Sequence, residues 1–177
     1  MANGILHFRV DDRMIHGIVA TDWVPAYNAT RAMVIDGPAS TNDIVRSGLK
    51  MACPAGVALS VLAPEKAVEN IKAGKYSAQR VFVVFRYIKT AYEVFKAGVE
   101  IPQLNLGNVT QNKGETTTLD KTVRVSDEEL AMLREMAAAG VKITARFRFS
   151  DNETELNGKL NYSRKTLIYR KEKESYV

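Results

Sequence analysis

The chain has 177 residues, of which 46% are hydrophobic and 25% charged, and its formal net charge is +5. This length suffices for one compact domain with a substantial core, and the composition is typical of a globular protein. No apolar run approaches the roughly 18 residues of a membrane span, and no signal peptide is recognisable. The single cysteine, Cys53, cannot form an internal disulfide, so we expect a cytoplasmic protein.

Short apolar runs alternate with helical patterns along the first 106 residues. The expected strands are residues 5–10, 31–36, 57–62, 80–86 and 103–106. The expected helices are residues 17–27, 43–51, 64–72 and 90–97. The stretch Thr41-Asn42-Asp43 offers a cap for the second helix, Pro64 suits the first position of the third, and Gly98 ends the fourth.

The remaining residues predict fewer regular elements. Residues 108–118 are polar and rich in Gly, Asn and Thr, so we expect a long loop, followed by a short strand at 123–125. Ser126 and Glu129 form a capping box for a helix ending at Ala139, with Gly140 after it. The last strand is expected at 141–149, with an exposed face or at a sheet edge, and residues 167–169 could add another.

The alternation of strands and helices predicts an α/β fold. We expect a single-domain open, mostly parallel β-sheet with helices on both faces. The main domain is placed at residues 1–150. Residues 151–177 are placed as a basic C-terminal extension of the same domain, or as a partly mobile end.

The most informative stretch runs from Arg9 to Gly17 and contains two arginines, two aspartates and a histidine. It follows the first predicted strand, so its polar side chains should lie at the carboxyl edge of the sheet. Open α/β sheets usually bind ligands at that edge. His16 is therefore the first candidate for chemistry, whereas His7, inside the strand, is expected to be structural.

Several common functional motifs do not occur. The chain has neither the glycine pattern of a dinucleotide site nor that of a P-loop, and two histidines with one cysteine give no zinc spacing. Ser47-Gly48 is not a nucleophile elbow, and Cys53 is expected to be a buried structural thiol. We therefore expect neither a metal nor a cofactor.

Two interpretations of His16 follow from the residues alone. It is either a satisfied histidine in a salt-bridged turn or a nucleophile that accepts a phosphoryl group. Arg9 and Arg13 can bind a dianionic phosphoryl group, and Asp11 or Asp12 can hold one ring N–H and so decide which nitrogen reacts. The first N–H groups of the helix after Gly17 add further donors for an anion.

A resemblance decides between these interpretations. The stretch from Arg9 to Val19, with Trp23, resembles the signature R-[IV]-D-[DE]-R-L-I-H-G-Q-V…W. This signature belongs to IIB components of the mannose/fructose/sorbose family of the bacterial phosphoenolpyruvate-dependent sugar phosphotransferase system (PTS). The similarity continues in order to about residue 150, through the segments 50–57, 65–68, 80–86, 98–108 and 126–141.

The resemblance implies that His16 carries the phosphoryl group as a phosphohistidine. His16 would accept it from a phosphorylated IIA protein or domain and pass it to a hexose or amino sugar entering through the membrane components IIC and IID. The enzyme class implied is protein-Nπ-phosphohistidine–sugar phosphotransferase, located in the cytoplasm and associated peripherally with the membrane. Arg13 and Arg9 would stabilise the phosphoryl group or position the loop, and Asp12 or Asp11 would orient His16. A homodimer is also possible.

The chain departs from the family pattern at three places. Ile18 replaces the usual Gln, Met14 replaces Leu, and Gly107-Asn108 stands where many members have Gly-Gly, which favours an amino sugar as substrate. Two alternatives stay open beside the phosphocarrier. One is a non-enzymatic regulatory binding module of the same fold. The other is a basic nucleic-acid-binding protein, suggested by the isoelectric point near 9.3 but by no binding motif, so no nucleic-acid partner is expected.

Overall fold

The computed structural model describes residues 3–111 and 114–161. The strands are β1 (Ile5–Asp11), β2 (Arg31–Ile35), β3 (Ala58–Leu62), β4 (Val81–Phe85), β5 (Gln103–Asn108), β6 (Thr117–Asp120), β7 (Val123–Val125), β8 (Lys142–Ala145) and β9 (Thr154–Glu155). The helices are η1 (Val19–Trp23), α1 (Val24–Ala26), α2 (Gly37–Thr41), α3 (Asp43–Ala52), α4 (Pro64–Lys72), α5 (Ile88–Lys96), α6 (Asp127–Ala138) and α7 (Asn157–Leu160).

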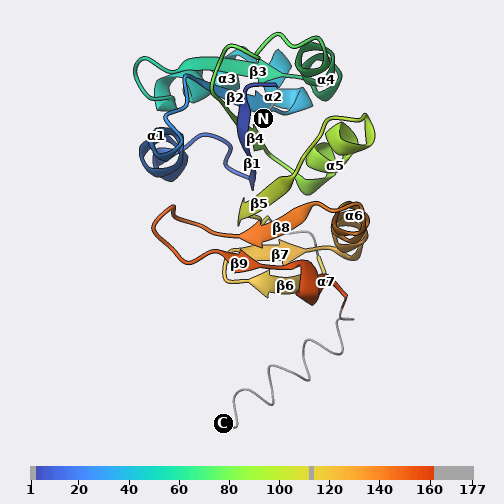
Figure 1. Cartoon of the computed structure of the whole chain (residues 1–177). Helices are drawn as coiled ribbons and strands as arrows, with labels where there is room; N and C mark the ends of the chain where they lie inside the picture. Colours follow the sequence, from blue (N-terminus) through green and yellow to red (C-terminus); the bar gives the residue numbers. More distant parts are fainter. Residues whose placement is uncertain (1–2, 112–113, 162–177) are drawn as a thin grey trace.

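Seven strands form one sheet in the order β3-β2-β4-β1-β5-β8-β9 (Figure 1). All neighbours are parallel except the short β9, which pairs antiparallel with β8. Strands β6 and β7 form a separate hairpin. The predicted open, mostly parallel sheet is confirmed, and β1 occupies its middle position.

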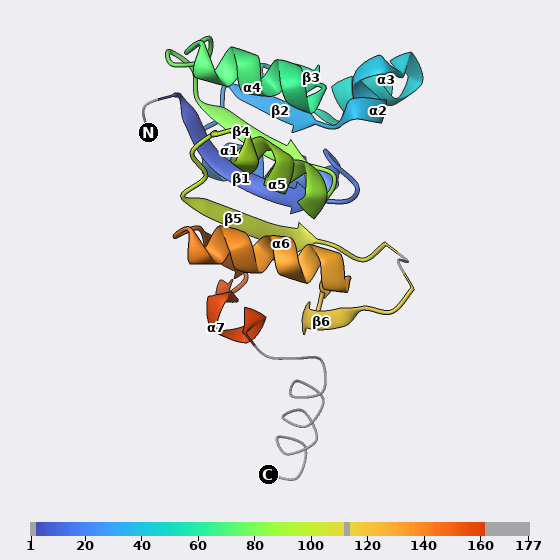
Figure 2. The ribbon, with the colours of Figure 1, turned by 90° about the vertical axis from the view of Figure 1, so that its right-hand side faces the viewer.

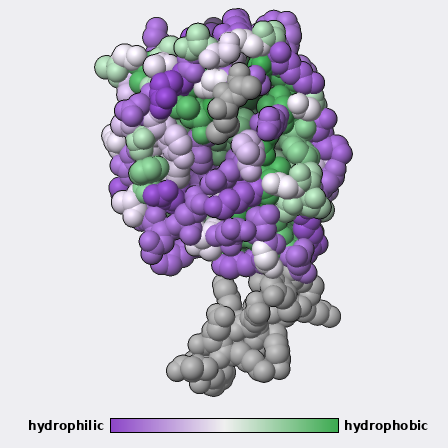
Figure 3. All heavy atoms as spheres, in the orientation of Figure 1, coloured by the Kyte–Doolittle hydropathy of each residue, from purple (hydrophilic) through white to green (hydrophobic). Residues whose placement is uncertain are grey.

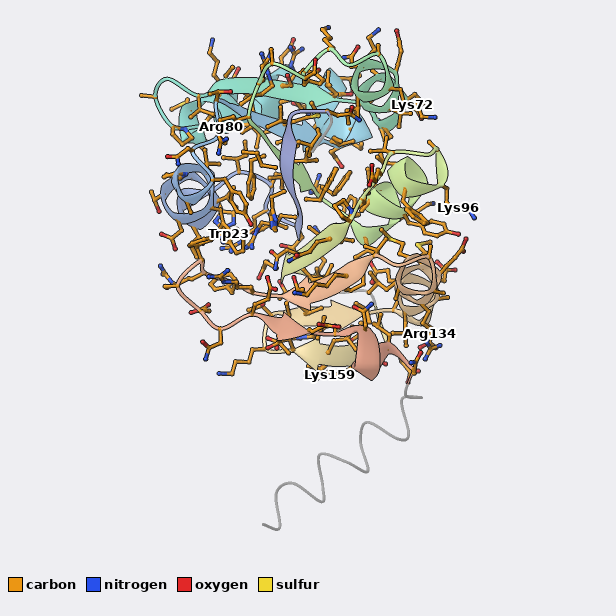
Figure 4. The ribbon with its side chains drawn as sticks, viewed as in Figure 1. Trp23, Lys72, Arg80, Lys96, Arg134 and Lys159 are labelled. Atoms are coloured by element: carbon orange, nitrogen blue, oxygen red, sulfur yellow. The ribbon has the colours of Figure 1, made fainter. Side chains whose placement is uncertain are left out.

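Helices cover both faces of the sheet, as predicted. Figure 2 looks onto α4, α5 and α6, whose buried residues join the strands in the largest hydrophobic cluster. Two smaller clusters on the opposite face involve α1 and α3, with Trp23 fully buried. Figure 4 shows Trp23 on the α1 side, away from Lys96 and Arg134 on the other helices. No helix among the described residues is long and apolar enough to cross a bilayer.

Local signals placed most helices correctly. Asn42 accepts a hydrogen bond from the backbone N–H of Val45 at the start of α3, and Pro64 is the first residue of α4. The capping box of Ser126 and Glu129 is present, and Gly140 follows α6 with φ +96°. Asn42, Ser126 and Glu129 supply hydrogen-bond partners that the start of a helix lacks, whereas Pro64 and Gly140 suit the backbone conformation at their positions. All of these signals are local, which is why they can be identified without tertiary information.

Three expected elements differ from the structure. The helix from Gly17 has a π-helical turn, η1, directly before Pro25, which lacks a backbone N–H. β5 extends to Asn108, two residues beyond its predicted end. The strand expected at 141–149 ends at Ala145, and it lies inside the sheet because β9 pairs with it. The expected strand at 167–169 lies outside the described residues.

The connections of the sheet single out the carboxyl end of β1. Its helix packs on one face, whereas α5 after β4 and α6 after β5 pack on the other. Such a point of divergence opens a crevice at the carboxyl edge. That edge lies at the right of Figure 2. Figure 3 shows the molecule from the opposite edge, where hydrophilic residues cover most of the lower part.

Candidate functional site

The loop after β1 turns sharply before the helix begins. Met14 has φ +60°, a left-handed conformation that residues other than glycine rarely adopt. Its backbone N–H donates to the carbonyl of Asp11 (2.9 Å), which closes the turn. Met14 and Ile15 are buried against the α3 side, and His16 follows with 17% of its side chain exposed. The turn therefore brings His16 back over the end of the strand.

Asp11 is the centre of the site. Its side chain is fully buried, and its Oδ2 lies 2.9 Å from Nε2 of His16 and 3.0 Å from Nη2 of Arg9. Its Oδ1 accepts the backbone N–H of Arg13 (3.1 Å) and lies 3.7 Å from that residue's Nε. One carboxylate thus contacts three of the four other predicted site residues, which holds the loop and the histidine in a fixed relation.

The charge state of Asp11 follows from these contacts. Burial alone raises the pKa of its carboxyl, but the hydrogen bond from His16 and the positive charge of Arg9 outweigh burial and hold that pKa below its usual value. Asp11 is therefore an acceptor only. Nε2 of His16 must donate to it, and the lone pair of the neutral ring is then on Nδ1.

Arg9 is fully buried, with no exposed surface. Besides Asp11, its guanidinium donates to Oδ1 of Asn105 (2.8 Å) and to the carbonyl oxygens of Arg146 (3.0 Å) and Phe147 (3.2 Å). A guanidinium with this many buried partners is not available to an incoming anion. Of the two roles predicted for Arg9, its position supports holding the loop, through Asp11.

Asp12 lies apart from His16. Its carboxylate accepts the side-chain amide of Asn108 (2.6 Å) and the backbone N–H groups of Thr110 (2.8 Å) and Gln111 (3.1 Å). No contact joins it to His16 among the described residues. The structure therefore brings Asp11, Arg9, Arg13 and His16 together. The side chain of Asp12 instead binds the neighbouring loop after β5, and its hydrogen bonds order that loop.

Arg13 is the exposed cation of the site, with 46% of its side chain accessible. Its guanidinium lies 5.6 Å from the centre of the Phe147 ring, a distance at which a cation is attracted to an aromatic face. Among the predicted residues it is the one that combines positive charge, accessibility and attachment to Asp11.

Sequence analysis missed the segment from Arg146 to Phe149. It leaves the sheet because the carbonyls of residues 146 and 147 accept from Arg9, and the carbonyl of Phe147 also accepts Nε1–H of Trp23 (2.9 Å). The alternating pattern predicted a strand here. The neighbouring residues carry no signal that the carbonyls of this segment instead bind a buried arginine about 140 residues away in the sequence. Gly107 was likewise missed as a packing residue. A Cβ there would lie 1.9 Å from Cζ of Arg9.

Two residues lie outside this cluster: His7 is buried, as expected, whereas Cys53 is less buried than expected. His7 is buried and stacks on Trp23, Tyr27 and Phe82. Burial, and then the charges of Arg9 and Arg146, lower its pKa to about 3, so it is neutral. Cys53 is half-buried at the end of α3, with its Sγ 3.6 Å from the carbonyl of Val57, and burial raises the pKa of its thiol.

The described residues contain no group of three His, Cys, Asp or Glu side chains placed to hold a metal ion. Ile18, which stands in place of the family's Gln, is half-buried and packs on the cluster of Val19, Trp23 and Val24. It therefore adds an apolar contact beneath the loop.

Comparison with known proteins identifies the class. A family profile described as PTS system sorbose subfamily IIB component matches residues 5–171. The sorbose-specific EIIB component of Lacticaseibacillus casei is 30% identical over 86% of this chain and 93% of its own length, and that of Klebsiella pneumoniae is 31% identical with the same coverage.

Solved structures agree with this assignment. The IIBSor domain of the sorbose permease from Klebsiella pneumoniae superposes with a TM-score of 0.82 at 30% identity, covering 89% of this chain and 96% of that one. An Escherichia coli IIB component specific for N-acetylgalactosamine has the same fold, with a TM-score of 0.78. The fold is thus that of a sugar phosphotransferase IIB component. The chain belongs to the sorbose subfamily of these components.

Proposed function

We propose that His16 is the residue that carries the phosphoryl group in this IIB component. The observation that supports this most is the buried carboxylate of Asp11, which lies 2.9 Å from Nε2 and is itself held by Arg9. A carboxylate in this place selects the ring tautomer and stabilises the positive charge that the ring acquires when the other nitrogen is phosphorylated.

The reacting atom we propose is Nδ1. Because Nε2 carries the proton donated to Asp11, the lone pair of Nδ1 attacks the phosphorus of the phosphohistidine on IIA. The new N–P bond forms as the bond to the donor histidine breaks, and the donor nitrogen retains that electron pair. The sugar hydroxyl oxygen then bonds to the phosphorus as the Nδ1–P bond breaks and its electron pair returns to Nδ1. The hydroxyl proton is released to solvent, and neutral His16 is restored.

Arg13 is the group we propose to contact the phosphoryl oxygens. It is the accessible guanidinium beside His16, and a guanidinium matches two phosphoryl oxygens at once. The helix that starts at Gly17 aims its first N–H groups at the same edge. Arg9 acts through Asp11, and Asp12 acts by ordering the loop of Asn108 to Gln111.

The partners and location follow from the family. We propose that phosphorylated IIA is the donor, that the IIC and IID membrane components present the sugar, and that the protein works at the cytoplasmic side of the membrane. The proposed activity is that of a protein-Nπ-phosphohistidine–sugar phosphotransferase. The packing of α7 on α6 and the pairing of β9 with β8 support placing residues 151–161 in the same domain. A homodimer stays a prediction.

The sugar is proposed as a hexose or amino sugar. Gly107 packs on Arg9 and Asn108 binds Asp12, so both residues belong to the support of the loop and do not favour an amino sugar. The relatives at 30% and 31% identity are named for sorbose, which makes sorbose the first sugar to test.

The direct test is phosphorylation in solution. The protein is incubated with phosphoenolpyruvate, the general phosphotransferase proteins and IIA, and its intact mass is measured. We expect a gain of one acid-labile phosphoryl group, which NMR of the phosphorylated ring assigns to Nδ1. His16→Ala should gain none, whereas His7→Phe, the matched control at the other histidine, should be labelled as the wild type is.

Other results would point elsewhere. If a IIA protein that labels another IIB component fails to label this chain, the phosphocarrier proposal is wrong and a regulatory binding module of the same fold becomes the better account. Labelling at Nε2 would keep the carrier and overturn the role given to Asp11.

A further inference from the structure

A groove of about 850 Å³ lies at the carboxyl edge of the sheet, where α2, α4, α5 and α6 begin. Figure 2 shows α4, α5 and α6 on one face, each starting near the ends of the parallel strands. The apolar part of the groove comes from Pro38, Ala63, Pro64, Tyr87 and Met132. None of these residues takes part in the site around His16.

The groove borders that site. Gln111 lines it, and the backbone N–H of the same residue donates to Asp12 (3.1 Å) on the His16 loop. Asp36 and Tyr87 also line it and follow β2 and β4, the latter being the neighbour of β1. A partner held in the groove therefore lies beside the histidine, on the side opposite α1.

The walls of the groove are acidic, although the chain as a whole is basic. Four lining carboxylates are exposed and have no ion-pair partner among the described residues: Glu65, Glu93, Asp127 and Glu128. Within the described part of the chain, Lys89 is the one cation that lines the groove. The lysines that end α4 and α5, Lys72 and Lys96, lie in the last turns of these helices and do not line the groove.

Helix capping explains part of this pattern. Glu65, Asp127 and Glu128 lie in the first turns of α4 and α6, where the helix dipole favours negative charge. Glu93 lies beyond the first turn of α5, so the dipole does not account for it. Unpaired carboxylates that gather around one apolar groove form a surface complementary to a segment that is both basic and apolar.

We propose that this groove docks a basic cytoplasmic loop of the IIC or IID membrane component. The proposal rests on the function proposed above. Cytoplasmic loops of membrane proteins carry an excess of lysine and arginine, which complements the four unpaired carboxylates. Apolar side chains of the same loop can pack on the apolar part of the groove. On the other side of the edge Arg13 is accessible, and its positive charge suits an acidic donor. The phosphoryl donor IIA and the membrane component that presents the sugar then approach His16 over surfaces of opposite charge.

Charge reversal tests the docking surface. The variant Glu93→Lys with Glu128→Lys reverses two groove charges. The matched control, Glu100→Lys with Glu155→Lys, changes the net charge equally at exposed sites outside the groove. Binding is measured by co-sedimentation with vesicles that contain IIC and IID, after subtracting binding to vesicles of the same lipids alone.

We expect wild-type binding to weaken as salt rises, and the groove variant to bind at least about tenfold more weakly, because two attractions become two repulsions. The control should stay within about threefold of the wild type. IIA should label all three proteins equally. Absent wild-type binding, or equal losses in both variants, overturns the docking site.

Two further outcomes are decisive. If the groove variant binds the vesicles normally but is no longer labelled by IIA, the groove receives the donor and the proposal is wrong. If IIA labels none of the proteins while the vesicle results are as expected, the docking site stands and the phosphocarrier function fails.

Discussion

Adding one methyl group at Gly107 should disable the site without touching His16. In Gly107→Ala the new Cβ would lie 1.9 Å from Cζ of Arg9 and 2.1 and 2.2 Å from its two terminal nitrogens. Real Cβ contacts are near 3.5 Å, so the guanidinium must move by about 1.5 Å. That movement breaks hydrogen bonds to Asp11, Asn105 and the carbonyls of Arg146 and Phe147.

The expected size of the effect follows from the contacts that Arg9 makes. Disrupting a fully buried charge pair costs about 3–5 kcal/mol, a large part of the 5–15 kcal/mol by which a typical domain is stable. Asp11 would lose its main cation, so the carboxylate that selects the tautomer of His16 would no longer be held in place. We therefore expect the free energy of unfolding to fall by about 3 kcal/mol or more, and phosphorylation by IIA to slow by at least about 100-fold.

Urea unfolding and the rate of labelling by IIA measure the two effects. Gly48→Ala is the matched control, because Gly48 lies inside α3 with open space around its Cβ position. Alanine there should raise the stability by about 0.5–1 kcal/mol. In the background of Arg9→Leu the Gly107→Ala change should cost little more, since the clashing group is gone. A stability within 1 kcal/mol of wild type together with normal labelling would refute the packing argument.

Three further predictions concern His7, Asp11 and Arg13. The pKa of His7 falls from 6.5 in the unfolded chain to about 3 in the fold, so stability is lost as the pH falls below 6.5. Between pH 7.5 and 5.0 that loss is about 2 kcal/mol, and His7→Phe should remove it in urea titrations; an unchanged pH dependence would contradict it. Asp11→Asn should cost about 3–5 kcal/mol because Arg9 is left unpaired, and calorimetry showing less than 1 kcal/mol would count against a buried ion pair. Arg13→Gln should leave stability within about 0.5 kcal/mol yet slow labelling by IIA, whereas equal rates would exclude contact with the phosphoryl group.

The fold could be predicted largely because its signals are local. Short apolar runs marked the parallel strands, and Asn42, Pro64 and the Ser126–Glu129 pair marked helix starts. These residues act on groups within four positions along the chain. The end of β8 had no such signal, because it depends on carbonyls at residues 146 and 147 binding an arginine on β1. The hydrophobic periodicity of one segment carries no information about a contact between residues so far apart along the chain.

The sequence could predict that the charged residues between Arg9 and Gly17 form one site, but it could not assign a separate role to each of them. Asp11 and Asp12 are neighbours of the same type, and either could have oriented His16. The structure separates them because Asp11 is the last residue of β1 and lies on the same side as Arg9, while Asp12 binds the loop after β5. A one-residue difference in where the strand ends would exchange them.

The buried pair of Arg9 and Asp11 is an expensive way to hold one histidine, since desolvating both charges costs several kcal/mol. An apolar pair would pack as well, but it would leave His16 free to rotate and to hold either tautomer. The ion pair instead gives Nε2 of His16 a fixed hydrogen-bond acceptor on β1, the middle strand of the sheet. The helices that follow its neighbours β4 and β5 pack on the other face of the sheet. Both sides of the carboxyl edge border this middle strand. In the function proposed above, His16 would therefore receive its phosphoryl group beside Arg13 and release it beside the acidic groove.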